Sequence, residues 1–159
     1  MTQPHSPSDF TFKQVDPRAP DAVACLTQFY EELATRLRSG FEVHLSADPS
    51  AADMMTPNGA FIVVYRGETP VACGGLKGHG DWGEVKRVWV SLSVRGHGVA
   101  KQIMTTLETK ARAMGLRTLR LDTNSALPEA VAMYPRLGWH EIERFNDDPY
   151  PDHFFEKHL

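Results

Sequence analysis

The amino-acid sequence predicts one mixed α/β domain whose segments follow the order β-α-(α)-β-β-β-α-β-α-β-β. Three observations support this class. The 159 residues suit one domain that buries about two-thirds of its unfolded surface. Apolar residues alternate in some segments and recur at helical spacing in others, which are the periods of strands and helices. Finally, consecutive strand-like segments precede a glycine-bearing junction that leads into a helical pattern.

The first third of the chain contains a strand and an amphipathic helix. Residues 10–15 alternate loosely and end at a turn-prone Asp-Pro pair, which indicates a short strand. Over residues 21–37 apolar side chains recur at helical steps, which predicts a helix with one buried face. Residues 41–59 show no clean period, and we expect a substrate-side loop there with a short helix over 51–55.

The remainder of the chain alternates between strands and helices. Two strand-like runs within 60–76 are joined by a short connection that contains glycine, which favours a hairpin, and residues 84–92 supply a further strand. A helical period begins after Gly98 and ends before Gly115, where a left-handed cap fits. The rest is predicted as a strand over 116–122, a helix over 128–137 and final strands over 139–145 and 152–159.

Composition excludes several classes of protein. The chain carries 17 basic and 20 acidic residues, a net charge of −3, so it lacks the basic surface that nucleic-acid binding requires. No apolar run approaches the roughly 18 residues of a membrane span, and a signal-peptide pattern is missing, which predicts a cytoplasmic protein. Residues 1–8 are expected to form a flexible polar tail before a single domain over 9–159. Cys25 and Cys73 lie in no metal or redox spacing and are predicted to be buried thiols.

The junction from Arg95 to Gly98 has two glycines, and several interpretations fit them. A helix N-terminus exposes unpaired N–H groups and a partial positive charge, so it can bind an anion. A tight turn that binds nothing is the alternative. A dinucleotide site is also considered, since Asp122 follows about twenty residues later. Lys101, however, stands where that fingerprint needs its third glycine, and the Gly-Lys-Ser or Gly-Lys-Thr of a Walker-type loop does not occur.

Two motifs occur in order on the expected elements. Arg95, Gly98 and Ala100, in the block EVKRVWVSLSVRGHGVA, match a pyrophosphate loop written Arg/Gln-x-x-Gly-x-Gly/Ala. Nearer the C-terminus, YPRLGW matches a Tyr-x-x-x-Gly-aromatic element that starts at Tyr134. On these motifs the chain resembles the Gcn5-related N-acetyltransferase (GNAT) family over most of residues 60–145. The resemblance implies the mixed-sheet fold of an acyl-CoA N-acyltransferase and an enzyme that moves the acetyl group of acetyl-CoA to an amine.

The resemblance also implies how acetyl-CoA would bind. In this family the strand before the loop separates from its neighbour, and its backbone pairs with the pantetheine arm. Here that strand carries Val88, Trp89 and Val90, and the N–H of Val90 would polarise the thioester carbonyl. Strict alternation would turn Val85 and Val88 to opposite faces of the sheet. Asn124 resembles an asparagine that relatives place beside the coenzyme arm. The pyrophosphate would lie on the N–H groups of Arg95, Gly96, His97, Gly98, Val99, Ala100 and Lys101.

Glu84 and Tyr134 are the candidate catalytic residues. Histone-type members of the family use a glutamate at the position of Glu84 as general base. A free glutamate titrates near ~4.3, so this role needs a raised pKa or a relaying water. Tyr134, with a phenol pKa near ~10, could return a proton to the coenzyme A thiolate, although Pro135 disfavours a helical conformation at that tyrosine. The alternatives are a solvated glutamate beside Lys86 and a tyrosine of the core.

The fold does not determine the acceptor. We expect a primary amine of a small molecule or peptide, while a non-catalytic coenzyme A-binding or sensor module is the alternative function. The histidines show no metal-ligand spacing, so no metal is predicted. Relatives commonly form homodimers through the last strands. The candidate acceptor-binding residues are Tyr30, Phe41, Arg87, Arg144, Asn146 and Tyr150.

Overall fold

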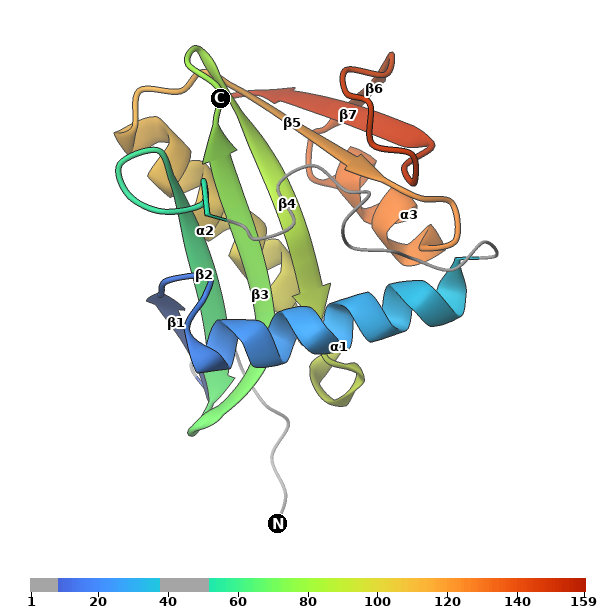
Figure 1. The fold of residues 1–159 in the computed structure, drawn as a ribbon. Helices are drawn as coiled ribbons and strands as arrows, with labels where there is room; N and C mark the ends of the chain where they lie inside the picture. The colour runs from blue at the N-terminus through green and yellow to red at the C-terminus, as the bar shows by residue number, and fades with distance from the viewer. Residues whose placement is uncertain (1–8, 38–51) are drawn as a thin grey trace.

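The computed structural model describes residues 9–37 and 52–159 and confirms the predicted mixed α/β fold (Figure 1). The described strands form a seven-stranded sheet in the order β1-β2-β3-β4-β5-β7-β6, and only β4 and β5 pair in parallel. The expected tail over 1–8 and the candidate Phe41 lie outside the described residues. The elements are β1 (Phe10–Gln14), α1 (Pro20–Arg36), β2 (Gly59–Arg66), β3 (Thr69–Gly78), β4 (Trp82–Val90), η3 (Leu92–Val94), α2 (Val99–Ala113), β5 (Thr118–Thr123), α3 (Pro128–Arg136), β6 (His140–Ile142) and β7 (His153–His158).

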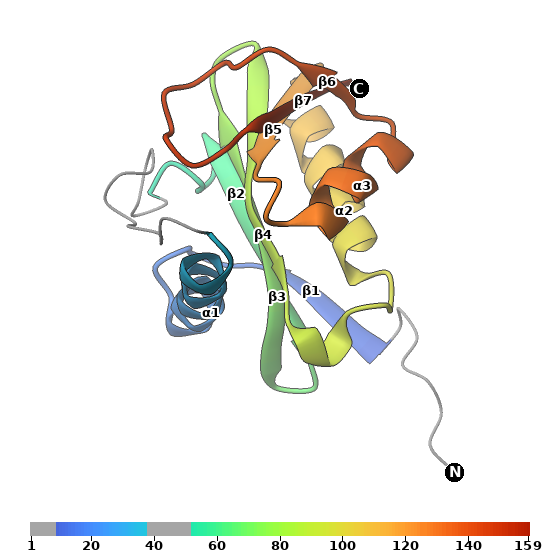
Figure 2. The same cartoon turned by 90° about the vertical axis from the view of Figure 1, so that its right-hand side faces the viewer.

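Helix α1 covers one face of the sheet, and α2 and α3 lie on the other (Figure 2). Helix α1 begins with Pro20 in its first turn, where the missing N–H costs nothing, and Asp21 complements the positive end of the helix. Its apolar side packs on the sheet as a small core that includes Cys25, Phe61 and Trp89. Both cysteines are free and buried, as predicted.

The larger core lies on the face covered by α2. Ile103, Leu107 and Ala111 recur at helical spacing and are fully buried against the sheet. Gly115 follows the helix with a φ of 83°, which confirms the predicted left-handed cap. Helix α3 continues through Pro135 because the proline lies near its C-terminal end, so few backbone hydrogen bonds are lost.

The sheet opens between β4 and β5. Their register contains only Trp82 opposite Thr118, Gly83 opposite Leu119 and Glu84 opposite Arg120. Strand β4 then continues to Val90 without pairing to β5, whereas β5 pairs along its other edge with β7 over its whole length. One edge of β4 is therefore available to hydrogen-bond a ligand, as the family resemblance implies.

A β-bulge corrects the expected alternation along β4. The register with β3 shifts between Cys73 and Gly75, and Arg87 adopts a φ of 59°, a left-handed conformation that is uncommon outside glycine. One extra residue is thereby inserted in β4. As a result Val85 and Val88 both pack in the α2-side core, although strict alternation predicts opposite faces.

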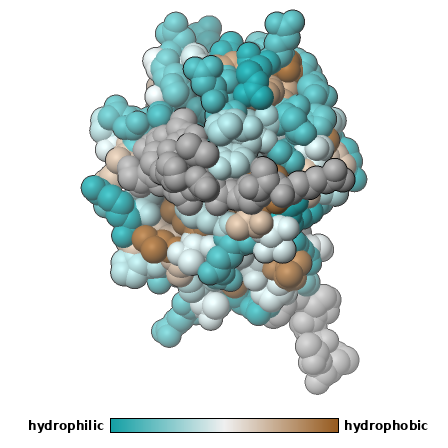
Figure 3. Space-filling model, turned by 45° about the vertical axis from the view of Figure 1, so that its right-hand side comes forward, coloured by the Kyte–Doolittle hydropathy of each residue, from teal (hydrophilic) through white to brown (hydrophobic). Residues whose placement is uncertain are grey.

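Smaller differences from the sequence-based expectations concern the connections. Residues 52–58 form turns rather than the short helix expected near 51–55, and β6 is shorter than the predicted strand over 139–145. Within the described residues, none of the helices has the length and apolar character needed to span a membrane. On the face shown in Figure 3, hydrophobic side chains are scattered among hydrophilic ones. The single-domain organisation over 9–159 stays a prediction.

Candidate active site

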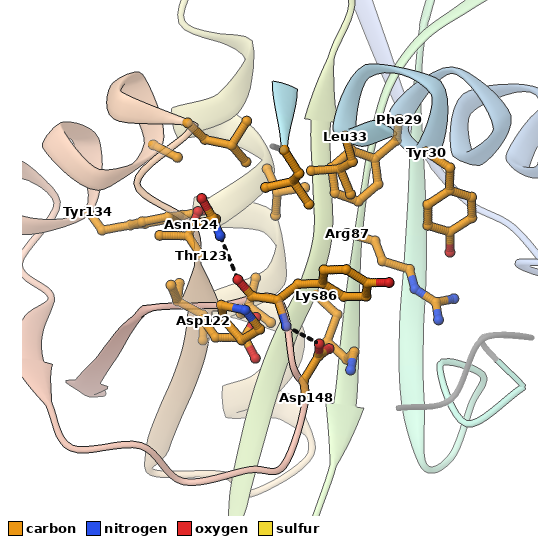
Figure 4. Close-up of a pocket in the computed structure, with 18 residues that line it drawn as sticks. Phe29, Tyr30, Leu33, Lys86, Arg87, Asp122, Thr123, Asn124, Tyr134 and Asp148 are labelled. Carbon is orange, nitrogen blue, oxygen red and sulfur yellow. Dashed lines mark hydrogen bonds between the residues drawn. The ribbon is translucent and has the colours of Figure 1, made fainter. Parts of the chain in front are cut away.

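Two cavities meet where the sheet opens. The first, here called the α1–α3 groove, runs between these helices along β4; the second, the β4–β5 cavity, lies in the opening between the two strands (Figure 4). Both are lined by Val88 and Tyr134. Of the predicted coenzyme-binding residues, the groove is lined by Val88, Trp89, Val90, Arg95, Gly96, Gly98, Val99, Ala100 and Lys101.

The N-terminus of α2 forms one end of the α1–α3 groove. Gly96 and Gly98 have φ values of 87° and 76°, so both glycines are required by the backbone itself. A Cβ built on either meets nothing within 4 Å, which leaves room for close approach of a ligand. No side chain caps the helix and its first turn has no acidic residue, so the exposed N–H groups and helix dipole favour an anion.

The backbone of Val90 faces the α1–α3 groove. The N–H of Ser91 donates to the carbonyl oxygen of Val71 on β3 at 2.8 Å. Because consecutive residues of a strand direct their backbone groups to opposite sides, the N–H and C=O of Val90 point away from β3. Arg95 Nε donates to the Val90 carbonyl at 2.9 Å, which agrees with that direction.

The Arg95 side chain holds the groove walls together. Its Nη2 donates to Glu32 Oε1 at 2.6 Å, and the same carboxylate accepts from Arg36 at 2.9 Å and from Trp89 Nε1 at 3.2 Å. Arg36 also pairs with Glu129 of α3. Burial raises the pKa of Glu32, but hydrogen bonds from Arg36 and Arg95 outweigh it and hold that pKa below its usual value. The Arg95 guanidinium is therefore engaged by the Val90 carbonyl and by Glu32.

Replacing Glu32 with glutamine is expected to lower the free energy of unfolding by about 1 kcal/mol, since part-exposed charge-assisted hydrogen bonds contribute roughly that much. A carboxylate whose pKa is lowered on folding stabilises above its unfolded pKa, and this contribution disappears as the pH falls through the folded value. Urea denaturation at pH 7 and pH 3 would measure the difference. Glu31→Gln, at an exposed neighbouring position, is the control; an equal loss in both variants would contradict the assignment.

Tyr134 lies at the junction of the two cavities. It projects from α3, is 5% exposed, and packs against Trp139 and Phe155 at centroid distances of 6.0 and 5.8 Å. Burial, and secondly the charge of Asp122, raise the pKa of its phenol, so the phenol stays protonated throughout the neutral range. This is the protonation state that a proton donor needs.

Glu84 lies outside the lining of both cavities. Its side chain is buried at the paired end of β4, where Oε1 is 3.0 Å from His79 Nε2 and Oε2 is 3.7 Å from Lys86 Nζ. The His79 ring stacks on Trp82 at 4.2 Å, which fixes one of these partners. The role of Glu84 as general base stays a prediction.

Asp122, which sequence reasoning did not select as a catalytic candidate, lines the β4–β5 cavity with Tyr134. Asn146 Nδ2 donates to its Oδ2 at 2.7 Å. Burial raises the pKa of Asp122 to about 6 against the opposing hydrogen bond from Asn146, with the nearby Glu84 charge a smaller raising contribution. The sequence held no distinguishing signal for it, because a polar residue that alternates with leucines is the ordinary pattern of a half-buried strand.

The remaining predicted site residues divide into two groups. Tyr30, Arg87 and Tyr150 line the β4–β5 cavity, as does Asn124, which lies there rather than in the groove. The Asn124 side chain donates to the Tyr150 carbonyl at 2.5 Å and accepts from the Ala126 N–H, so it holds a turn. The other group lines neither space and comprises His97, Arg144 and Asn146.

Arg144 and Asn146 do not line the cavity, but they support Asp122, which does. Arg144 donates to the carbonyls of Asn146, Asp148 and Pro151, which folds the segment before β7 into a compact loop. That loop presents Asn146 to Asp122. These two residues therefore support a lining residue rather than line the cavity, and their assignment as acceptor contacts stays a prediction.

Strand pairing also gathers His140, Glu156 and His158, whose potential ligand atoms lie within 4.8 Å of one another. The second oxygen of Glu156 accepts from Arg120 Nε at 2.9 Å, so an ion-pair network accounts for this cluster. It lines neither the groove nor the cavity. The expectation that the protein holds no metal stays a prediction.

A mixed sheet opened between two parallel strands, with a glycine-bearing helix N-terminus beside the opening, defines the acyl-CoA N-acyltransferase class. The chain matches the model of the acetyltransferase (GNAT) family over residues 26–139 and belongs to that family. It is 31% identical over 140 residues to an IAA acetyltransferase of Azospirillum brasilense. The matched region spans 84% of this chain and 90% of that relative.

Solved structures support the same fold. A GNAT-family acetyltransferase of Staphylococcus aureus superimposes with a TM-score of 0.81 at 14% identity, over 94% of this chain and 99% of that one. A GNAT-family acetyltransferase of Elizabethkingia anophelis with acetyl-CoA bound gives a TM-score of 0.64 at 12% identity, over 96% and 99% of the chains. The predicted acyltransferase class is thus confirmed, with acetyl-CoA the donor that the family uses.

Proposed function

We propose that the protein transfers the acetyl group of acetyl-CoA to a primary amine of a small molecule or peptide by direct attack of the amine on the thioester. One observation carries this proposal: the α1–α3 groove and the β4–β5 cavity meet at Val88 and Tyr134. A donor held in the groove and an acceptor held in the cavity would bring their reacting atoms together there.

On the donor side, the first-turn N–H groups of α2 would bind the pyrophosphate, and the unpaired edge of β4 would hydrogen-bond the pantetheine arm. The Val90 N–H points toward the groove and is held by the neighbouring Ser91–Val71 pairing, so it is preorganised to stabilise the negative charge that develops on the thioester oxygen. Tyr134 would then supply a proton to the departing thiolate.

The test is acetyl-CoA turnover by the wild-type protein against a panel of amines: putrescine, 2-phenylethylamine, glycine methyl ester, a lysine-bearing peptide and aniline. Release of free thiol and mass spectrometry of the acetylated amine measure the reaction, and isothermal titration measures acetyl-CoA binding separately. We expect binding and turnover with at least one alkylamine. Binding without any turnover would overturn the proposal in favour of the sensor module, and the absence of binding would overturn both.

A further inference from the structure

We propose that the acceptor is an alkylamine that binds as its ammonium ion in the β4–β5 cavity, and that Asp122 takes its proton. This inference rests on the proposed acetyl transfer and deepens it.

Asp122 lies on β5 and lines the cavity beside the sheet opening. Asp122 ends the part of β5 that borders the sheet opening, and its carboxylate lines the cavity together with Tyr134 at the junction with the groove. Figure 4 shows Asp122 and Tyr134 on the same side of the cavity. Asn146 Nδ2 donates to one oxygen of this carboxylate, Oδ2, at 2.7 Å. An ionised carboxylate offers about four lone-pair sites, so it can accept a proton while it holds this hydrogen bond.

The charges that act on Asp122 come from several elements. Strand β4 contributes Glu84 and Lys86, the loop before β7 contributes Asp148, and α3 contributes the phenol of Tyr134. Burial is the main cause that raises the pKa of Asp122 to about 6, and the two neighbouring carboxylates raise it further against Lys86. The group is therefore ionised at neutral pH yet basic enough to accept a proton, which a solvated aspartate is not.

The protonation state of the amine at neutral pH determines whether a base is needed. An alkylamine resembling a lysine side chain, with a pKa of about 10.4, is neutral in roughly one molecule in 2,500 at pH 7. A cavity that binds the abundant ammonium form must remove a proton, and a partly buried carboxylate both attracts this cation and accepts the proton. An arylamine is already neutral at pH 7 and needs no such base.

The proton balance closes with the residues present. Asp122 takes one proton from the ammonium, which frees the nitrogen lone pair to form the C–N bond. The C–S bond then breaks with its electron pair on sulfur, and the nitrogen loses its second proton. Tyr134 donates its proton to the thiolate and recovers one from the nitrogen, so the products are the amide and the free thiol. The proton on Asp122 is released to solvent.

The experiment compares wild type, Asp122→Asn and Asp122→Glu, with the most reactive alkylamine of the panel and its β,β-difluoro analogue, whose amine is far less basic. Asp81→Asn, an exposed aspartate in the turn before β4, is the matched control. For the alkylamine we expect wild-type kcat/KM to level off above a pKa near 6. The kcat/KM of Asp122→Asn should be about 100-fold below that of wild type at pH 7. It should rise about tenfold per pH unit from pH 6 to 9, as the neutral amine becomes available.

Two further readouts separate a proton acceptor from a structural residue. The difluoro analogue should reduce the gap between wild type and Asp122→Asn to less than fivefold, and Asp122→Glu should restore the levelling pH profile. Removal of a carboxylate whose pKa is raised by folding should also increase the thermal midpoint of Asp122→Asn at pH 7, with no increase near pH 3.5. Asp81→Asn should match wild type in every assay.

The outcomes distinguish this inference from the proposed function. If wild type turns over alkylamines but Asp122→Asn keeps the wild-type rate and pH profile, the Asp122 assignment is wrong and acetyl transfer stands. A loss of equal size for the alkylamine and the difluoro analogue would assign Asp122 a purely structural role. If arylamines alone are acetylated, the ammonium acceptor is wrong. If wild type acetylates no amine, the proposed function itself fails.

Discussion

Ala100→Glu is expected to weaken acetyl-CoA binding by about 100-fold or more while leaving the fold intact. Ala100 is in the first turn of α2 and lines the α1–α3 groove. A carboxylate there lies where the pyrophosphate is proposed to bind, and two unit charges about 4 Å apart at an effective dielectric of about 20 repel by about 4 kcal/mol. That energy exceeds what a 100-fold loss of affinity requires.

The same substitution should stabilise the ligand-free protein. A glutamate in the first turn of a helix interacts favourably with the positive helix end, typically by about 0.3–1 kcal/mol. Opposite changes in affinity and stability would be measured by isothermal titration with acetyl-CoA and by urea denaturation. Thr105→Glu, with the same charge change at an exposed position later in α2, is the control. Equal weakening in both variants would reduce the effect to net charge and contradict the proposed anion site.

Tyr134→Phe is expected to lower kcat by about 10- to 100-fold and to change the KM for acetyl-CoA by less than twofold. General acids typically contribute about 10²–10⁴-fold. The lower part of that range is expected because burial raises the pKa of this phenol, which reduces the driving force for proton donation to a thiolate whose parent thiol has a pKa of about 8.5. The ring keeps its packing against Trp139 and Phe155, so binding should survive.

A matched tyrosine is available for this test. Tyr65 is also buried, but it lies in the α1-side core and donates to Asp21 at 2.7 Å, away from the groove and the cavity. Tyr65→Phe should therefore keep kcat within twofold, even if its thermal midpoint falls. Steady-state kinetics with the amine of the panel that reacts fastest, together with single-turnover measurements, would separate chemistry from product release. An unchanged kcat in Tyr134→Phe would remove this residue from the mechanism.

Much of the fold could be predicted because local patterns and tertiary packing agree. The apolar spacing after Gly98 gave helix α2 and its end at Gly115, and alternation gave the strands that pair around β3. The bulge at Arg87 could not be predicted, because it depends on the register between β3 and β4 rather than on the residues of β4 alone. The bulge places Val85 and Val88 on one face of the sheet, and this arrangement could not be predicted because it depends on the same register.

The proposed donor half of the site follows from sequence more directly than the proposed acceptor half. Residues 95–101 are contiguous, so their backbone groups converge at one helix N-terminus wherever that helix packs. The acceptor half combines residues that are distant in sequence. Glu84 and Asp122 come close only because β4 and β5 pair in parallel at one end and then diverge, and Asn146 reaches Asp122 only through the loop that Arg144 holds.

The sequence by itself determined the order of elements, the glycine conformations at the pyrophosphate loop and the class of acyl donor, since each depends on residues close together along the chain. Tertiary structure alone decided which carboxylate lines the β4–β5 cavity. Glu84 is at the paired end of β4, where His79 and Lys86 hold it, whereas Asp122 is at the open end of β5 beside Tyr134. The physical reason is that burial and neighbouring charge, which set both access and pKa, arise only once the strands are paired.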